Sequence, residues 1–201
     1  MICRHCSFKL IHTFVDLNSS PPSNSYLTKK TINESEKWYP LKVLVCDKCW
    51  LVQTEDFVAA EEMFSPDYAY FSSFSKLFLS HAENYVREMA LRFSLTKQSM
   101  VVEVAANDGY LLQFVKEKGI PCYGIEPTHN TAVAARKKEI EILEEFFGEK
   151  LADDLVRAGR QADLAIANNV LAHVPDINNF VKGFAKILKP DGVVTFENPH
   201  L

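Results

Sequence analysis

The stretch that most constrains the fold is Val101–Leu112. Its β-branched run ends at Val104, small and turn-prone residues follow up to Gly109, and an apolar helical pattern begins after them. This order predicts a strand, a tight turn and a helix N-terminus. A doubly wound parallel sheet uses that arrangement to hold a nucleotide-like ligand.

Two acidic residues suggest which ligand. Glu103 lies at the end of the first strand, and Glu126 follows the next apolar run, Cys122–Ile125. A carboxylate about 20 residues past the turn is placed to bind ribose hydroxyls. The turn lacks G-x-G-x-x-G, which disfavours a pyrophosphate. Two carboxylates suit an adenosine ligand that carries an ammonium group, such as S-adenosylmethionine.

The rest of the C-terminal region continues the alternation of strands and helices. A helical pattern begins at Ser72, Gly119 ends a second helix, Thr128 is expected to N-cap a third, and Lys189–Gly192 is expected to form a turn. These elements predict an α/β fold with a doubly wound parallel sheet and right-handed crossovers. The expected strands are 100–105, 121–126, 140–143, 163–167 and 193–197.

Four of the five cysteines form two Cys-x2-Cys pairs, Cys3/Cys6 and Cys46/Cys49. Two such knuckles predict a closed, four-thiolate structural zinc site, although two unrelated pairs of reduced cysteines remain an alternative. Zinc would let a segment too small for its own core fold. The fifth cysteine, Cys122, is expected in the core.

We therefore expect a zinc-binding domain over 1–53, a linker over 54–72, and a ligand-binding domain over 73–201. Within the expected zinc-binding domain, the sequence predicts a loop at Asn18–Asn24 and a strand at Leu41–Val45.

Composition limits the partners. The net charge of −4 argues against nucleic acid or an anionic membrane as the main partner. No apolar run reaches about 18 residues, and the N-terminus lacks the apolar core of a signal peptide. We expect a cytoplasmic protein that acts on a small molecule.

Together these motifs resemble the bacterial sugar C-methyltransferase family, in which a zinc-binding domain precedes a class I S-adenosylmethionine-dependent methyltransferase domain. Besides the cysteine pairs, the resemblance rests on Tyr68–Ser73, Glu103–Gly109, Gly124–Pro127, Glu145–Phe147, Asn168–Pro175 and Glu197–Leu201. It implies C-methylation of a nucleotide-linked keto-deoxysugar through an enolate.

The resemblance also implies the cofactor-binding residues. Glu103, Ala105, Asn107 and Gly109 would line the methionine end, and Glu126 would bind the ribose. Glu145 and Phe146 would lie near the adenine, and Asn169 would approach the cofactor from the fourth strand. Ala105 departs from the usual glycine and adds a methyl group where the backbone should approach the ligand closely.

Two residues are candidates for catalysis. Tyr68 matches the family tyrosine assigned to the active site, and its hydroxyl could donate to the enolate oxygen. Covering the sheet edge is an equally weighted alternative for it. His173, just past the fourth strand, is the candidate base, with a role in the loop around Pro175 as the alternative.

The family pattern continues after Leu201 with a Tyr-x-Glu-His motif that is absent here, so we expect a sheet truncated after the fifth strand. That strand would be an exposed edge and would favour self-association. Two other functions remain open: a cofactor-binding but catalytically incomplete fragment or zinc-stapled interaction module, and a nicotinamide-dependent oxidoreductase.

Overall fold

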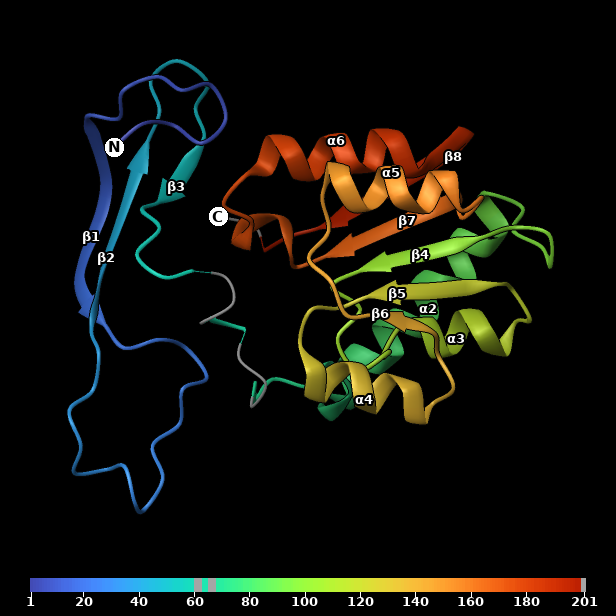
Figure 1. The fold of residues 1–201 in the computed structure, drawn as a ribbon, viewed down its shortest axis with the longest axis horizontal. Helices are drawn as coiled ribbons and strands as arrows, with labels where there is room; N and C mark the ends of the chain where they lie inside the picture. The colour runs from blue at the N-terminus through green and yellow to red at the C-terminus, as the bar shows by residue number, and fades with distance from the viewer. Residues whose placement is uncertain (60–62, 65–67, 200–201) are drawn as a thin grey trace. The chain divides into compact units, whose positions relative to one another are not determined.

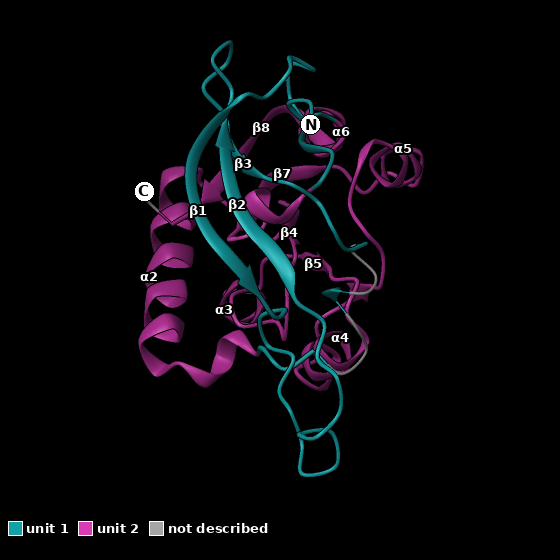
Figure 2. Cartoon of the chain, turned by 90° about the vertical axis from the view of Figure 1, so that its left-hand side faces the viewer, with its two compact units in different colours: residues 1–70, 175–178 teal, residues 71–174, 179–201 magenta. Residues whose placement is uncertain are grey.

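The computed structural model describes residues 1–59, 63–64 and 68–199. The chain divides into two compact units (Figure 2). Unit 1 comprises residues 1–70 and 175–178, and unit 2 comprises residues 71–174 and 179–201. Each unit is described by itself.

Unit 1 contains a three-stranded antiparallel sheet in the order β1-β2-β3 (Figure 1). Its strands are β1 (His12–Ser20), β2 (Tyr39–Val45) and β3 (Val52–Thr54). The expected strand at 41–45 is confirmed as part of β2. The prediction that a loop begins at Asn18 is wrong, because β1 continues to Ser20. The ladder slips between Asp16 and Ser19, where Asn18 has a φ of 63°. Such a bulge leaves loop-like residues inside a strand.

Unit 2 contains a five-stranded parallel sheet in the order β6-β5-β4-β7-β8, which confirms the predicted fold class. Chain direction and order place the carboxyl ends of all five strands at one edge. The elements are η1 (Ser72–Phe74), α2 (Lys76–Arg92), β4 (Val101–Val104), α3 (Leu112–Glu117), β5 (Cys122–Ile125), α4 (His129–Lys137), β6 (Ile142–Leu143), α5 (Glu149–Arg157), β7 (Ala162–Asn168), η2 (Leu171–His173), α6 (Ile177–Ile187) and β8 (Leu188–Glu197).

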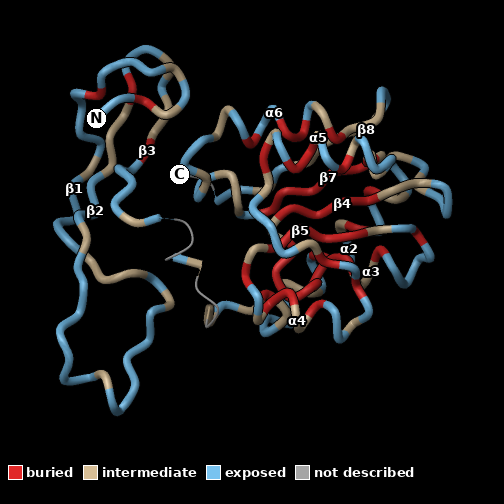
Figure 3. Tube along the Cα trace, viewed as in Figure 1, coloured by how far each residue is buried: buried red, intermediate tan, exposed pale blue. Residues whose placement is uncertain are grey.

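Helices cover both faces of this sheet, and the central strands β4, β5 and β7 are buried (Figures 1 and 3). On one face, α2, α3 and α4 pack against side chains that include Val101 and Ile166. On the other, α5 and α6 pack against side chains that include Val102 and Ala165. Because neighbouring residues of a strand point to opposite faces, the unbroken apolar run of β4 serves both cores.

Two details differ from the sequence-based expectations. A turn was predicted at Lys189–Gly192, before the last strand. This prediction is wrong, because β8 already begins at Leu188 and includes these residues. The pairs Ala162–Leu188 and Leu164–Val193 show that the residues between them bulge out of register. Thr128 does precede α4, as expected for an N-cap, but its side chain makes no capping hydrogen bond.

Other expectations hold. Gly119 follows the end of α3 with a φ of 70°, a left-handed conformation that favours glycine. Cys122 is partly buried against the α2–α3–α4 core. None of the helices in the described parts of the chain is both long and apolar enough to cross a membrane.

Candidate functional site

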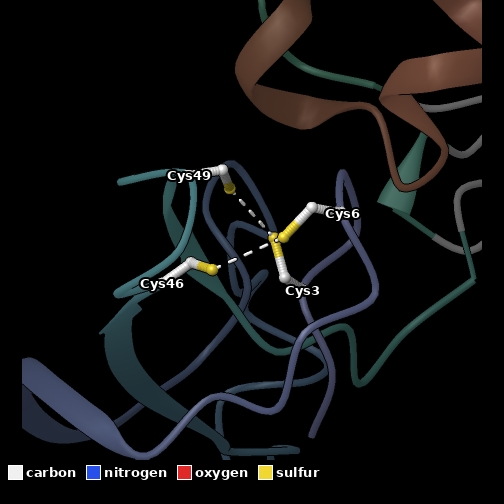
Figure 4. A group of neighbouring side chains, drawn as sticks. All are labelled: Cys3, Cys6, Cys46 and Cys49. Atoms are coloured by element: carbon white, nitrogen blue, oxygen red, sulfur yellow. Dashed lines mark hydrogen bonds between the residues drawn. The ribbon is translucent and has the colours of Figure 1, made fainter.

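The four cysteines of the two knuckles converge at one end of unit 1, with their sulfur atoms facing one another (Figure 4). The Sγ atoms of Cys3 and Cys49 are 3.6 Å apart, as are those of Cys6 and Cys46. All four lie within 4.8 Å of one another. Zn–S bonds of about 2.3 Å in a tetrahedron place sulfurs roughly 3.8 Å apart, so the cluster fits zinc.

The two knuckles have the same backbone geometry. In each, the carbonyl of the first cysteine accepts a hydrogen bond from the residue after the second: Ser7 N–H to Cys3 and Trp50 N–H to Cys46, both 2.9 Å. Ser7 and Trp50 both have left-handed φ values, 59° and 63°.

The Cys3 thiol is prepared for a metal. Burial raises its pKa, but hydrogen bonds from the Cys6 backbone and the Gln53 side chain outweigh burial and lower the pKa to about 6. At Cys49 the Leu51 backbone lowers the pKa, but burial and hydrogen bonds with the other three thiols outweigh it and raise the pKa to about 12. Within the metal-free cluster the Cys3 thiolate is therefore favoured first, and zinc binding must release the protons of the other thiols.

The second candidate site is the turn that follows β4 in unit 2. Ala105, Asn107 and Gly109 have φ values of 59°, 49° and 72°. Glycine adopts this conformation freely and asparagine tolerates it, whereas alanine adopts it at a cost. The Ala105 and Ala106 amides both donate to the Ile125 carbonyl, which fixes the start of the turn against the end of β5.

Glu103 is a buried carboxylate without a partner. It is 1% exposed, and neither of its oxygens has a hydrogen-bond partner among the described residues. Burial raises its pKa well above the ordinary value, and the carboxylates of Glu126 and Asp108 add to the shift. The Tyr110 hydroxyl partly opposes the shift. It makes no hydrogen bond to either oxygen of Glu103 in the structure.

Glu126 follows β5 and is held by the backbone. Its Oε2 accepts from Asn107 N–H and its Oε1 from Thr128 N–H, both at 2.9 Å. Burial raises its pKa, and hydrogen bonds with Thr128 and Asn107 oppose that shift. Each carboxylate oxygen can accept more than one hydrogen bond, so Glu126 retains capacity for two ribose hydroxyls in a fixed orientation.

The loop after β6 carries the predicted adenine-side residues, Glu145 and Phe146, which are both exposed. The loop is anchored through Glu144, which accepts hydrogen bonds from Arg136 and His129. These bonds, with His129 contributing most, lower the pKa of Glu144.

Asn169 follows β7 and is exposed, with a φ of 53°. Its amide donates to the Glu197 carbonyl at 2.7 Å. The predicted cofactor residues thus all lie in unit 2, at or just past the carboxyl ends of β4, β5, β6 and β7.

The two predicted catalytic residues have different surroundings. Tyr68 belongs to unit 1, is half-buried and packs against Phe64 with ring centroids 5.6 Å apart. His173 ends η2 in unit 2 and its side chain is exposed. Partial desolvation of its ring lowers the pKa of His173. Contact with water keeps this shift small. Both roles remain predictions.

Several contacts around the turn after β4 were not predicted from the sequence. Asp108 is 3% exposed and contacts Ser73 and Lys138. Near the end of β8, His81 Nε2 and Glu197 Oε2 are 2.7 Å apart. Ser73 and Asp108 both lie in the sequence motifs, but the spacing of the motifs did not indicate that Ser73 would contact Asp108.

Comparison with known proteins agrees with this geometry. Residues 78–201 match a family model described as a methyltransferase domain, and residues 3–64 match one described as a zinc binding domain. The chain belongs to the methyltransferase domain family. The predicted combination of a zinc-binding domain with a methyltransferase domain is confirmed, and the cysteine cluster provides the zinc ligands of the former.

Two curated relatives are also methyltransferases. C-methyltransferase NovU from Streptomyces niveus is 27% identical over 199 residues, covering 99% of this chain and 47% of the relative. The ubiquinone biosynthesis O-methyltransferase of Salmonella paratyphi A is 28% identical over 100 residues, covering 48% of this chain and 40% of the relative. The chain thus spans less than half the length of these relatives.

Among solved structures, DesVI from Streptomyces venezuelae has a TM-score of 0.50 and 20% identity, covering 62% of this chain and 52% of that protein. This similarity supports the fold.

The residues at the carboxyl edge fit S-adenosylmethionine. The unpartnered Glu103 carboxylate suits a cationic ligand group, and the oriented Glu126 carboxylate suits a ribose diol. No G-x-G-x-x-G cradle is present for a dinucleotide pyrophosphate, which argues against the nicotinamide alternative.

Proposed function

We propose that this protein is an S-adenosylmethionine-dependent C-methyltransferase that acts on a nucleotide-linked keto-deoxysugar. The observation that carries the cofactor assignment is the buried and unpartnered carboxylate of Glu103 beside the oriented carboxylate of Glu126. The methyltransferase domain family and the similarity of 99% of this chain to about half of a C-methyltransferase support the reaction type.

The chain's own residues would bind and orient the cofactor. When bound, S-adenosylmethionine supplies an electrophilic methyl group on a positively charged sulfur. The turn at Ala105–Gly109 and Asn169 would position the methionine end, Glu126 would hold the ribose, and the loop with Glu145 and Phe146 would border the adenine.

Methylation of a carbon requires a nucleophilic carbon on the acceptor. A base removes the proton next to the ketone, and a donor stabilises the developing enolate oxygen. Within this proposal His173 is the candidate base and the Tyr68 hydroxyl is the candidate donor. The exposed position of His173 leaves its ring accessible to an acceptor.

Titration calorimetry tests the cofactor assignment with S-adenosylmethionine, S-adenosylhomocysteine and NAD. We expect Glu126→Ala to weaken S-adenosylmethionine binding at least tenfold, or about 1.4 kcal/mol, because it removes two charge-assisted hydrogen bonds. Glu88→Gln, at an exposed position of α2, is the control. Unchanged affinity in Glu126→Ala would place the ribose elsewhere.

The acceptor is tested by incubating the protein with S-adenosylmethionine and a panel of nucleotide-linked 4-keto sugars. Mass spectrometry should detect a product heavier by one methylene, and NMR should place the new methyl group on carbon. Methylation only on oxygen or nitrogen would contradict the proposal. Cofactor binding without any methylated product would favour a cofactor-binding module.

A further inference from the structure

Lys138, which follows α4, directs its ammonium group at the turn after β4. Its Nζ donates to the Asp108 carbonyl and to Ser73 Oγ, both at 2.7 Å, and lies 3.6 Å from Asp108 Oδ2. The Asp108 side chain is only 5% exposed. Lys138 therefore compensates a buried charge while contacting two separate segments of unit 2.

The segment before α2 contacts the same turn through its backbone. Ser72 N–H donates to Asn107 Oδ1 at 2.9 Å, and Ser73 N–H donates to Asp108 Oδ2 at 3.3 Å. Ser72 is itself buried. Asn107 and Asp108 thus accept two backbone hydrogen bonds, and Lys138 closes the arrangement through the Ser73 hydroxyl.

The turn needs restraint from outside. Ala105 and Asn107 both have left-handed φ values. Residues with a side chain adopt this conformation less readily than glycine, so contacts from outside the turn must help to hold it. The Asn107 amide is also the group that holds Glu126 Oε2. Displacing Asn107 would therefore disturb the carboxylate that orients the proposed cofactor.

We propose that Lys138 is a positioning residue for cofactor binding. It holds the Asn107–Asp108 turn and the Ser72–Ser73 segment together, so that binding the cofactor and ordering this segment stabilise each other. The cofactor part rests on the proposed function. The coupling between the two segments is a property of the chain and can be measured without any ligand.

The test compares Lys138→Met with Lys137→Met. Met keeps most of the aliphatic length and removes the ammonium group, and the exposed Lys137 is the last residue of α4, next to Lys138 in the chain. A third variant, Ser73→Ala, removes the hydroxyl but leaves the contact between Lys138 and Asp108. Circular dichroism and thermal unfolding first establish a temperature at which all three variants are folded.

At that temperature, amide hydrogen exchange by NMR is measured at Ser72 and Ser73 without ligand. We expect Lys138→Met to speed exchange at both amides about tenfold or more, Ser73→Ala to have a smaller effect, and Lys137→Met to match the wild type. Wild-type exchange rates in Lys138→Met would overturn the proposed coupling.

Calorimetry with S-adenosylmethionine supplies the second readout. Lys138→Met should weaken binding about tenfold, and Lys137→Met less than twofold. S-adenosylmethionine should slow exchange at Ser72 and Ser73 in the wild type but much less in Lys138→Met. A purely structural role for Lys138 would lower the melting temperature and leave affinity and this ligand-dependent protection unchanged, which would overturn the positioning role.

A wild-type protein that does not bind S-adenosylmethionine would contradict the proposed function and the cofactor part of this inference. The exchange data without ligand would still decide whether Lys138 couples the two segments.

Discussion

At the residue scale, the buried carboxyl group of Glu103 should lower the free energy of unfolding of the cofactor-free protein. Its folded-state pKa is raised by burial, so the unfolded chain ionises first as the pH rises. Stability of the cofactor-free protein should therefore fall from a pH near the ordinary value of 4.5 up to the raised folded-state pKa. A cationic ligand favours the ionised form, so binding should release protons and affinity should increase with pH over the same range.

Glu103→Gln should separate these two effects. Removing the ionisable group should raise the melting temperature of the cofactor-free protein at pH 7.5, by about 2–4 °C for each kcal/mol recovered. The gain should shrink towards pH 4.5. The same variant should bind S-adenosylmethionine at least tenfold more weakly, a loss of about 1.4 kcal/mol.

Thermal melts at several pH values measure the first effect. Calorimetry in two buffers of different ionisation enthalpy measures proton release. Equal cofactor affinity across the range from pH 5 to 8 would show that Glu103 does not titrate on binding.

The sequence indicated candidate site residues better than it indicated their contacts. Glu103 and Glu126 stand out in the sequence as candidates because a carboxylate interrupts or ends an apolar strand. Ala105 was recognised as a departure from glycine, and its left-handed φ of 59° now gives a physical cost to that departure. Lys138 could not be found, because a lysine at a helix end gives no sign of which distant carboxylate it will contact.

At the scale of secondary-structure elements, strongly periodic and buried segments were predictable. The strands of the parallel sheet and the helices between them follow from apolar runs and glycine stops. The bulged part of β8 was read as a turn because Lys189–Gly192 has turn-forming residues, yet strand pairing resumes beyond it. β1 was missed because its side chains are mostly exposed and its apolar alternation is confined to Val15 and Leu17.

The small sheet of unit 1 should depend on its metal. Among the residues that the structure describes, the buried apolar cluster of unit 1 consists of Cys3, Leu10 and Cys46, too few to stabilise a fold without help. We expect about one zinc per chain by elemental analysis. Cys46→Ser should reduce that content and make residues 1–53 more sensitive to protease. Cys122→Ser, outside the cluster, is the control.

Chelation of the metal provides an independent check. It should increase cleavage within unit 1 before unit 2 unfolds. Protein that is free of metal and equally resistant to protease in both regions would show that the cysteines are not a structural metal site.

At the scale of the whole molecule, β8 is the edge strand of the five-stranded sheet. Its Val193, Val194 and Thr195 are only partly covered, and Phe196 is 38% exposed. Exposed edges favour pairing with another chain, so we expect the 201-residue protein to self-associate at micromolar concentrations.

Light scattering over a concentration series measures this association. Val193→Lys, at a residue outside both core clusters, should reduce it by placing a charge at the edge. Val181→Lys, on the exposed surface of α6, is the matched control. A wild type that is monomeric throughout the series, or equal effects of both variants, would contradict association through β8.

The order of strands in unit 2 also has a consequence for the time course of folding. The central strand β4 pairs on one side with β5, as in Val101 with Cys122, and on the other with β7, as in Val101 with Leu164. During synthesis, β4, β5 and β6 can meet before β7 has left the ribosome, whereas the pairing with β7 must close a much longer loop. Glu103 pairs with Ile166 of β7, so it reaches its buried position only at that late step. The proposed cofactor site would then be completed only after β7 has been synthesised, although the motif that begins it lies in the middle of the chain.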